Sequence, residues 1–171
     1  MAFEYKDVLA GPIVRRVEQQ LVSVWIALRK PATGKLSVWE GVKTGDASSG
    51  TELITGSVDT ISVGAELHLA LVVAILPDNP GEQLKSDTLY SYDLEVKEPG
   101  TASGQRLLQL GLLGDADSKG NKCPEPLGYK KRRLPAFSIP PSDIGKLHLL
   151  QGSCRMPHAD RRCGRILAGR R

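Results

Sequence analysis

The most regular alternation of apolar and polar residues in the chain lies in LKSDTLYSYDLEVK, residues 84–97. Successive side chains of a β-strand point to opposite faces, so this pattern predicts a strand with one buried face. The residues expected to point inward are Tyr90, Tyr92, Leu94 and Val96, and those expected to point outward are Ser91, Asp93, Glu95 and Lys97. This strand places the chain among the β-proteins.

The same segment resembles the sixth strand, named F, of fibronectin-type-III-like sandwiches. In such domains a leucine precedes a polar turn, and a tyrosine at the start of the strand packs into the core while its hydroxyl bonds to nearby backbone. Leu84 would be that leucine, and either Tyr90 or Tyr92 would be the corner tyrosine. The resemblance implies an all-β fold, an immunoglobulin/fibronectin-III-like β-sandwich.

Earlier segments alternate in the same way, and no segment shows a sustained helical period. The apolar residues at even positions of 22–28 share one predicted face, whereas Trp25 lies on the other and is expected to pack against another layer. The alternation resumes at residues 36–38 after a turn at residues 32–34. Residues 21–40 are therefore predicted to form a hairpin.

Three further segments complete the predicted sandwich. Residues 67–75 are apolar on both faces, which predicts a central strand that is covered on both sides. The leucines of residues 107–110 predict one more strand, and the turn-rich residues 114–126 predict exposed turns. The sandwich is expected to span residues 8–133.

The composition is that of an ordinary globular protein. The chain has 171 residues, of which 40% are hydrophobic and 25% charged. Its apolar runs are far shorter than the ~20 residues that cross a bilayer, so we expect no membrane partner. The first residues lack the pattern of a secretory signal, so a cytoplasmic location is the default, and an extracellular one stays open.

The basic charge is concentrated toward the C-terminus. Residues 1–128 hold 12 basic and 17 acidic side chains, whereas residues 129–171 hold 11 and 2. The run Lys130-Lys131-Arg132-Arg133 could attract the phosphates of a nucleic acid. Because aromatic residues do not alternate with these cations, a solvated linker is the favoured interpretation, and a nucleic-acid partner is not expected.

The segment LPAFSIPP, residues 134–141, contains three prolines, which remove backbone donors and hold the chain extended. Residues 134–145 are therefore predicted to be a Pro-rich linker between domains. The next segment, KLHLLQGSC, residues 146–154, predicts a short strand that ends in Gly-Ser-Cys. In α/β folds, chemistry commonly lies at such strand ends.

Several segments, in this order, resemble the PhoD-like (alkaline phosphatase D) metallophosphatase family over roughly residues 10–158. They are GPIVRRV at 11–17, VSVWIALR at 22–29, LYSYDL at 89–94, LPAFSIPP at 134–141 and LLQGSCRMPH at 149–158. The resemblance implies that an N-terminal sandwich packs against a calcineurin-like α/β domain. It also implies that Cys154, in the Gly-Ser-Cys motif, occupies the position of a metal-ligating thiolate.

By the same resemblance, Arg155 and His158 are candidate contacts to a substrate phosphate. The full-length family uses iron and calcium or other divalent metals, but a two-metal site needs several Asp, His and Asn ligands. Residues 146–171 would be a truncated start of the catalytic domain, with a basic tail that departs from the family from Asp160 onward. We therefore expect a non-catalytic fragment that holds no metal or other cofactor.

Two other interpretations of the whole chain stay open. The first is an autonomous fibronectin-III-like binding module. The second is one half of a phosphatase whose catalytic domain is encoded separately and is the partner of this chain.

For three local patterns in the sequence, a structural role is favoured over a ligand site. Cys123, Cys154, His158 and Cys163 could in principle bind zinc, but their spacing matches no recognised zinc motif. Residues 115–120 begin like a calcium loop, but Lys119 stands at a ligand position, so a polar turn is favoured. His68 is expected to be a satisfied core residue.

Overall fold

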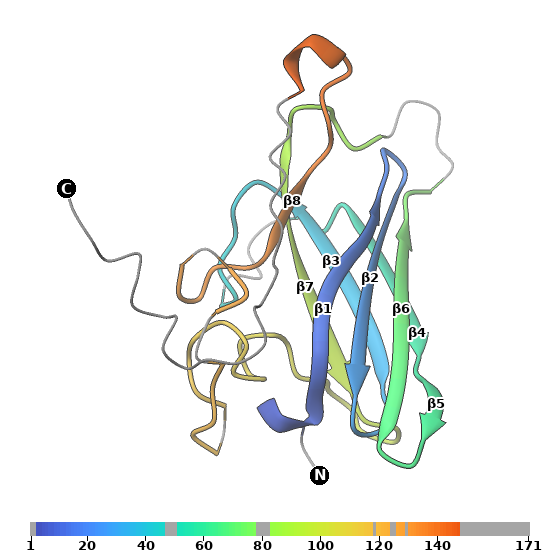
Figure 1. Ribbon diagram of the computed structural model, residues 1–171, viewed down its shortest axis with the longest axis vertical. Helices are drawn as coiled ribbons and strands as arrows, with labels where there is room; N and C mark the ends of the chain where they lie inside the picture. The colour runs from blue at the N-terminus through green and yellow to red at the C-terminus, as the bar shows by residue number, and fades with distance from the viewer. Residues whose placement is uncertain are drawn as a thin grey trace, which may run out of the picture.

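The computed structural model describes residues 3–46, 51–77, 83–117, 119–123, 126–128 and 130–147. The chain folds into two antiparallel sheets that pack face to face (Figure 1). The strands are β1 (Val8–Val17), β2 (Leu21–Leu28), β3 (Thr33–Glu40), β4 (Ile54–Asp59), β5 (Ile61–Gly64), β6 (Leu67–Ile75), β7 (Leu89–Lys97) and β8 (Ala136–Ser138). Two short 3-10 helices, η1 (Tyr5–Asp7) and η2 (Ile144–Lys146), flank the strands. The predicted all-β sandwich of two packed sheets is confirmed.

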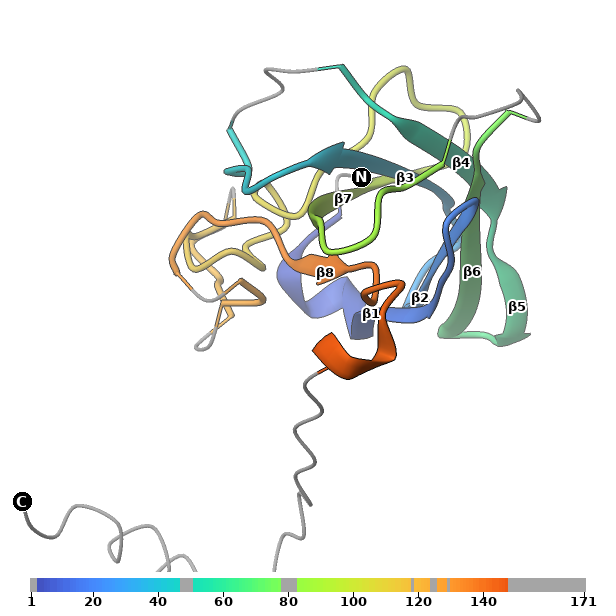
Figure 2. The same cartoon turned by 90° about the horizontal axis from the view of Figure 1, so that it is seen from above.

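Sheet A has the strand order β1-β2-β6-β5, and sheet B has the order β4-β3-β7-β8. Figure 2 shows the two layers from above, with β2 and β3 on opposite sides of the core. The predicted hairpin over residues 21–40 is therefore wrong. The chain crosses between the sheets at residues 29–32, because the crossing lets the apolar face of β2 meet the apolar face of β3 across one core.

Strand β7 follows the predicted alternation on its inner face. Tyr90, Tyr92, Leu94 and Val96 are all buried in the core. On the other face, Ser91 and Asp93 were expected in solvent and are also buried. The outward prediction fails for these two residues because distant segments cover that face of sheet B.

Gly41 and Lys43, after β3, bond to the Ser91 hydroxyl. The cover over Asp93 is the connection between β7 and β8, whose described parts are residues 98–117, 119–123, 126–128 and 130–135. We call these parts the β7–β8 connection. Its leucines at 107, 110, 112 and 113 are buried, but they form successive turns and not the predicted strand. The amide of Leu110 donates to the carbonyl of Arg106 at 3.0 Å, and that of Leu112 donates to Leu107 at 3.0 Å. The compact turns bury these leucines against sheet B, which an extended strand with alternating faces would not do.

The predicted linker also differs from the structure over its first residues. Ala136–Ser138 form β8, which pairs with the start of β7, and Leu134, Phe137 and Ile139 belong to the core. Phe137 stacks on Tyr90 with ring centroids 5.6 Å apart. Proline is tolerated next to this segment because β8 is a three-residue edge strand.

Strand β6 lies between β2 and β5, so its inner position in the sheet agrees with the prediction. Its predicted cover on both faces is wrong. Ala70, Val72 and Ala74 face the core, whereas Leu71 and Ile75 on the opposite face are 49% and 60% exposed. Trp25 is half-buried beside Leu71 on that outer face, where the described chain provides no further layer.

The sandwich closes along one side through a close approach of β4, in sheet B, to β6, in sheet A. Both strands lie side by side in Figures 1 and 2. A Cβ atom added to Gly56 would collide with the Val73 carbonyl and come within 2.9 Å of Ala74 Cα. Glycine is therefore the only residue that lets the two backbones approach so closely.

Gly56→Ala should destabilise the fold by about 2–3 kcal/mol, because the backbone of β6 must move to admit the methyl group. Urea denaturation measures the free energy of unfolding. Gly64→Ala is the matched control, because no described heavy atom lies within 4 Å of its Cβ position, and its change should stay within about 0.5 kcal/mol. Equal effects of the two substitutions would contradict this role of Gly56.

Of the two tyrosines considered for the start of this strand, Tyr90 has the expected hydrogen bond to nearby backbone. Its ring is buried, and its hydroxyl accepts a hydrogen bond from the backbone amide of Lys85 at 2.7 Å. The bond joins the start of β7 to the turn five residues upstream. In this way one side chain fixes how the chain enters the second sheet.

Tyr90→Phe should lower the free energy of unfolding by about 1–2 kcal/mol, because the Lys85 amide loses its acceptor. Tyr92→Phe is the control, since the structure places no hydrogen bond on the Tyr92 hydroxyl among the described residues. Thermal or urea unfolding of both variants compares the two hydroxyls. A larger loss from Tyr92→Phe than from Tyr90→Phe would refute the corner assignment.

Candidate functional site

The site residues predicted from the resemblance lie outside the described residues. This holds for Cys154, Arg155 and His158, and also for Cys163 of the weighed zinc site. Within the described ranges, no group of three or more His, Cys, Asp or Glu residues could hold a metal ion. The described residues therefore do not fit a metal centre, and no metal-dependent step follows from them. His68 is buried in β6, as expected for a core residue.

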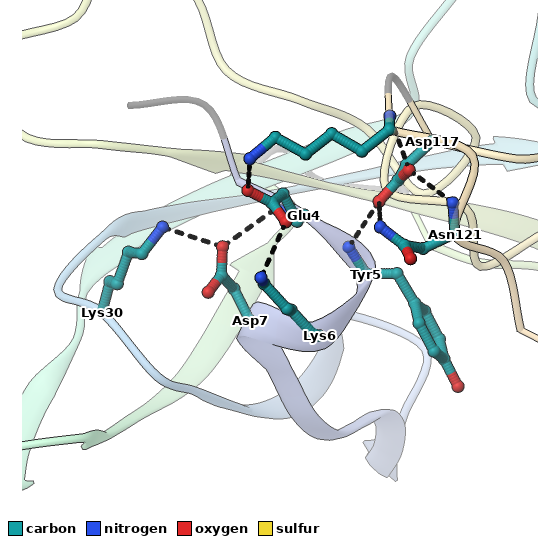
Figure 3. A network of polar contacts seen from close by, with 8 residues as sticks. Glu4, Tyr5, Lys6, Asp7, Lys30, Asp117 and Asn121 are labelled. Atoms are coloured by element: carbon teal, nitrogen blue, oxygen red, sulfur yellow. Dashed lines mark hydrogen bonds and ion pairs between the residues drawn. The ribbon is translucent and has the colours of Figure 1, made fainter.

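The densest polar cluster of the described chain lies at the N-terminus, and Figure 3 shows it from close by. We call it the N-terminal clasp: Glu4, Lys6, Asp7, Lys30, Asp117, Lys119 and Asn121, with the backbone of Tyr5. Its residues come from η1, the β2–β3 crossing and the β7–β8 connection. The clasp thus joins three segments that are far apart in the sequence.

Two carboxylates of the clasp are held by lysines. Asp7 accepts from the Glu4 amide at 3.0 Å and from Lys30 Nζ at 2.9 Å. Glu4 accepts from Lys119 Nζ on one oxygen and pairs with Lys6 at 3.3 Å through the other. The bond from Lys119 holds the pKa of Glu4 below its usual value.

Asp117 organises the turn that resembles the start of a calcium loop. One of its oxygens accepts from the amides of Lys119 and Asn121, each at 2.8 Å, and the other accepts from the Tyr5 amide at 3.1 Å. Burial alone would raise the pKa of Asp117, but these backbone donors outweigh it and lower the pKa. Four N–H donors in all fill the carboxylate, which supports the polar-turn interpretation.

The electrostatics of the clasp suit a structural role. Both Glu4 and Asp117 have a lowered pKa, so they stay ionised at neutral pH and are poorly matched to proton transfer. The nearby Tyr5 hydroxyl has a raised pKa, chiefly through its hydrogen bond with Cys123. These shifts favour charge pairing over acid–base chemistry.

The basic run at residues 130–133 is held by acids of the same chain. Lys131 pairs with Asp115 at 2.7 Å, and Arg132 pairs with Asp115 at 3.0 Å and with Asp46 at 3.1 Å. The carbonyl of Arg132 also accepts from the Gly45 amide at 2.8 Å. Lys131 and Arg132 are thus tied to the sandwich, although their side chains are 65% and 47% exposed. The run is solvated as predicted, but these ion pairs attach it to the sandwich.

The one described carboxyl with a strongly raised pKa is Asp93, which lies on the covered face of β7 and is 2% exposed. Burial raises its pKa to about 6, although the amides of Leu107 and Leu94 donate to it at 3.2 and 2.9 Å. Arg106 lies 4.0 Å away. Sequence reasoning missed this residue because its cover lies 14 residues further along the chain.

Comparisons with family models, curated proteins and solved structures found no match to this chain. The PhoD-like resemblance therefore stays a prediction. In the part of the chain that the structure describes, no helix is both long and apolar enough to cross a membrane.

Asp93→Asn should change how stability depends on pH. The pKa of Asp93 is about 6 when folded, against an ordinary value of 3.8. The folded state binds the Asp93 proton more tightly than the unfolded state does. The bound proton therefore stabilises the fold in full below pH ~4, and this stabilisation is lost as the pH rises through ~6. Relative to Asp93→Asn, the free energy of unfolding of the wild type should fall by about 2–3 kcal/mol between pH ~4 and pH ~7.

Urea denaturation at a series of pH values measures this difference. Glu95→Gln is the comparison variant, because Glu95 contacts the same arginine, with 3.6 Å between Arg106 Nε and the carboxylate. Its negative charge helps to raise the pKa of Asp93, so the variant should keep the fall in stability but show it at lower pH. A constant gap between wild type and Asp93→Asn over the whole range would show that Asp93 does not titrate in this way.

Proposed function

We propose that this chain is the non-catalytic, fibronectin-III-like sandwich of a PhoD-like metallophosphatase and that it is inactive by itself. The strand order is the observation that supports the fold in this proposal. When the strands are named A, B, C, C′, D, E, F and G along the chain, the sheets become A-B-E-D and C′-C-F-G. This arrangement matches the Greek-key order of immunoglobulin-like sandwiches.

The corner residue Tyr90 supports the same proposal. It lies at the start of the strand in position F and bonds to backbone upstream, as the corner tyrosine of such domains does. Core packing and ion pairs account for the described polar clusters, which fits a supporting domain.

The catalytic part of the proposal rests on the resemblance around Cys154. After Ile139 the chain passes through Pro140-Pro141 toward the Gly-Ser-Cys motif. In a complete phosphatase, Cys154 would provide a thiolate ligand, while Arg155 and His158 would face the substrate phosphate. A thiolate suits transition metals such as iron, but the remaining ligands must come from a catalytic domain, whether fused or separately encoded.

An autonomous binding module is a second candidate, and one observation favours it. Among the residues that the structure describes, the last member of the hydrophobic core is Ile139, so residues 140–147 do not belong to it. The two candidates differ in whether residues 148–171 are needed for function. A binding activity that persists in a chain of residues 1–147 would favour the autonomous module.

The purified 171-residue chain should hydrolyse p-nitrophenyl phosphate and its diester no faster than the metal ions alone. A single thiolate cannot hold two ions ~3.5–4 Å apart, so the attacking and leaving oxygens are not clamped. The assay is run with iron, calcium or manganese, and Cys154→Ser is the matched control. Enzyme-like hydrolysis by the wild type that falls in Cys154→Ser would contradict the proposal.

A further inference from the structure

The two outer faces of the sandwich differ in their cover. The β7–β8 connection buries the outer face of sheet B around Asp93, whereas the outer face of sheet A carries large apolar side chains in solvent. We call the latter the outer apolar face and define it by Ile13, Trp25, Ile61, Val63, Leu71 and Ile75. These residues come from all four strands of sheet A.

Strand register makes this face continuous. Ile13 of β1 pairs with Trp25 of β2, which pairs with Leu71 of β6, so the three side chains form one row across the sheet. Five of the six residues are strongly exposed: Ile13 45%, Leu71 49%, Ile75 60%, Val63 60% and Ile61 72%. Exposed apolar surface of this extent marks an interaction site.

An ion pair lies at each end of the face. At one end Arg29 binds Glu66 at 2.7 Å, and at the other Arg16 binds Glu18 at 2.6 Å. A molecule that binds this face therefore needs an apolar surface with little net charge. The chain's own residues 148–171 are a poor match, because they carry six arginines and a single acid.

We propose that the outer apolar face binds the same face of a second copy of this chain and forms a two-fold dimer. A two-fold axis brings an apolar, charge-balanced face against an identical one, so self-complementarity needs no further feature. Two sheet faces pack ~10 Å apart with interdigitating side chains, as the two sheets do inside the sandwich.

The size of the face fits this occupant. The five exposed aliphatic side chains present on the order of 100 Å² each, so with part of Trp25 the face offers about 500–600 Å² per copy. The dimer then buries about 1,000–1,200 Å², which is at the lower limit for a specific interface. A dimer of moderate affinity follows, and it is independent of the proposed phosphatase relationship.

Sedimentation velocity of the full chain over a range of concentrations tests the dimer. The wild type should change from monomer to dimer as its concentration rises. Leu71→Lys places a charge in the central row and should weaken the dimer at least ~10-fold. Ile144→Lys is the control, because Ile144 is 85% exposed in η2 and lies outside the face, and it should behave as wild type.

Tryptophan fluorescence gives a second readout. The chain has two tryptophans, of which Trp39 is buried in the core and Trp25 lies on the outer apolar face. Dilution should shift the emission to the red as Trp25 becomes hydrated, and the shift should persist in Trp39→Phe.

Three results would overturn the proposal. They are a wild-type monomer at all concentrations, a dimer that Leu71→Lys leaves unchanged, and open-ended assembly in place of a closed pair. Circular dichroism of each variant confirms that the sandwich is folded, so loss of the dimer reports on the interface.

Discussion

The burial of β7 on both faces is the constraint on which the rest of the structure depends. Its inner face packs Tyr90 and Leu94 into the core, and Phe137 of β8 stacks on the same tyrosine. Its outer face holds Asp93, whose carboxylate accepts from the Leu107 amide and so fixes the β7–β8 connection over sheet B. That connection in turn reaches the N-terminus through the clasp. One strand therefore determines where three separate segments lie.

On the opposite side of the molecule, the packing depends on the close approach of two strand backbones. Gly56 allows β4 to lie against β6, and small residues on the core face of β6 fill the narrow space there. This arrangement turns the larger side chains of β6 outward, because a strand that packs so closely on one face cannot place leucines there. The outer apolar face is thus a direct consequence of how the sandwich closes. Sheet B receives a cover from its own chain, whereas the described residues leave the outer face of sheet A in solvent.

The electrostatics separate structural charges from the one unusual carboxyl. In the clasp and around Arg132, acids lie next to lysines, arginines or backbone amides, and the pKa values of Glu4, Asp46, Asp115 and Asp117 are lowered. Asp93 is the exception, because burial outweighs its donors and raises its pKa. Its burial is a cost of covering β7, and it gives the fold a dependence on pH.

The sequence by itself located β2, β3, β6 and β7 and predicted the core face of β7, because alternation is a local property of the backbone. It also narrowed the tyrosine whose hydroxyl bonds to nearby backbone to Tyr90 or Tyr92, and the structure shows that it is Tyr90. It did not locate β1, β4 or β5. It failed at the hairpin over residues 21–40, at the leucines of residues 107–110, at β8, at the outer face of β6 and at the outward face of β7. The leucines and β8 are errors about the strand itself, whereas the other three concern what lies next to a strand. Alternation tells which way a side chain points, but only the tertiary structure decides whether solvent, a distant segment or another layer meets it there.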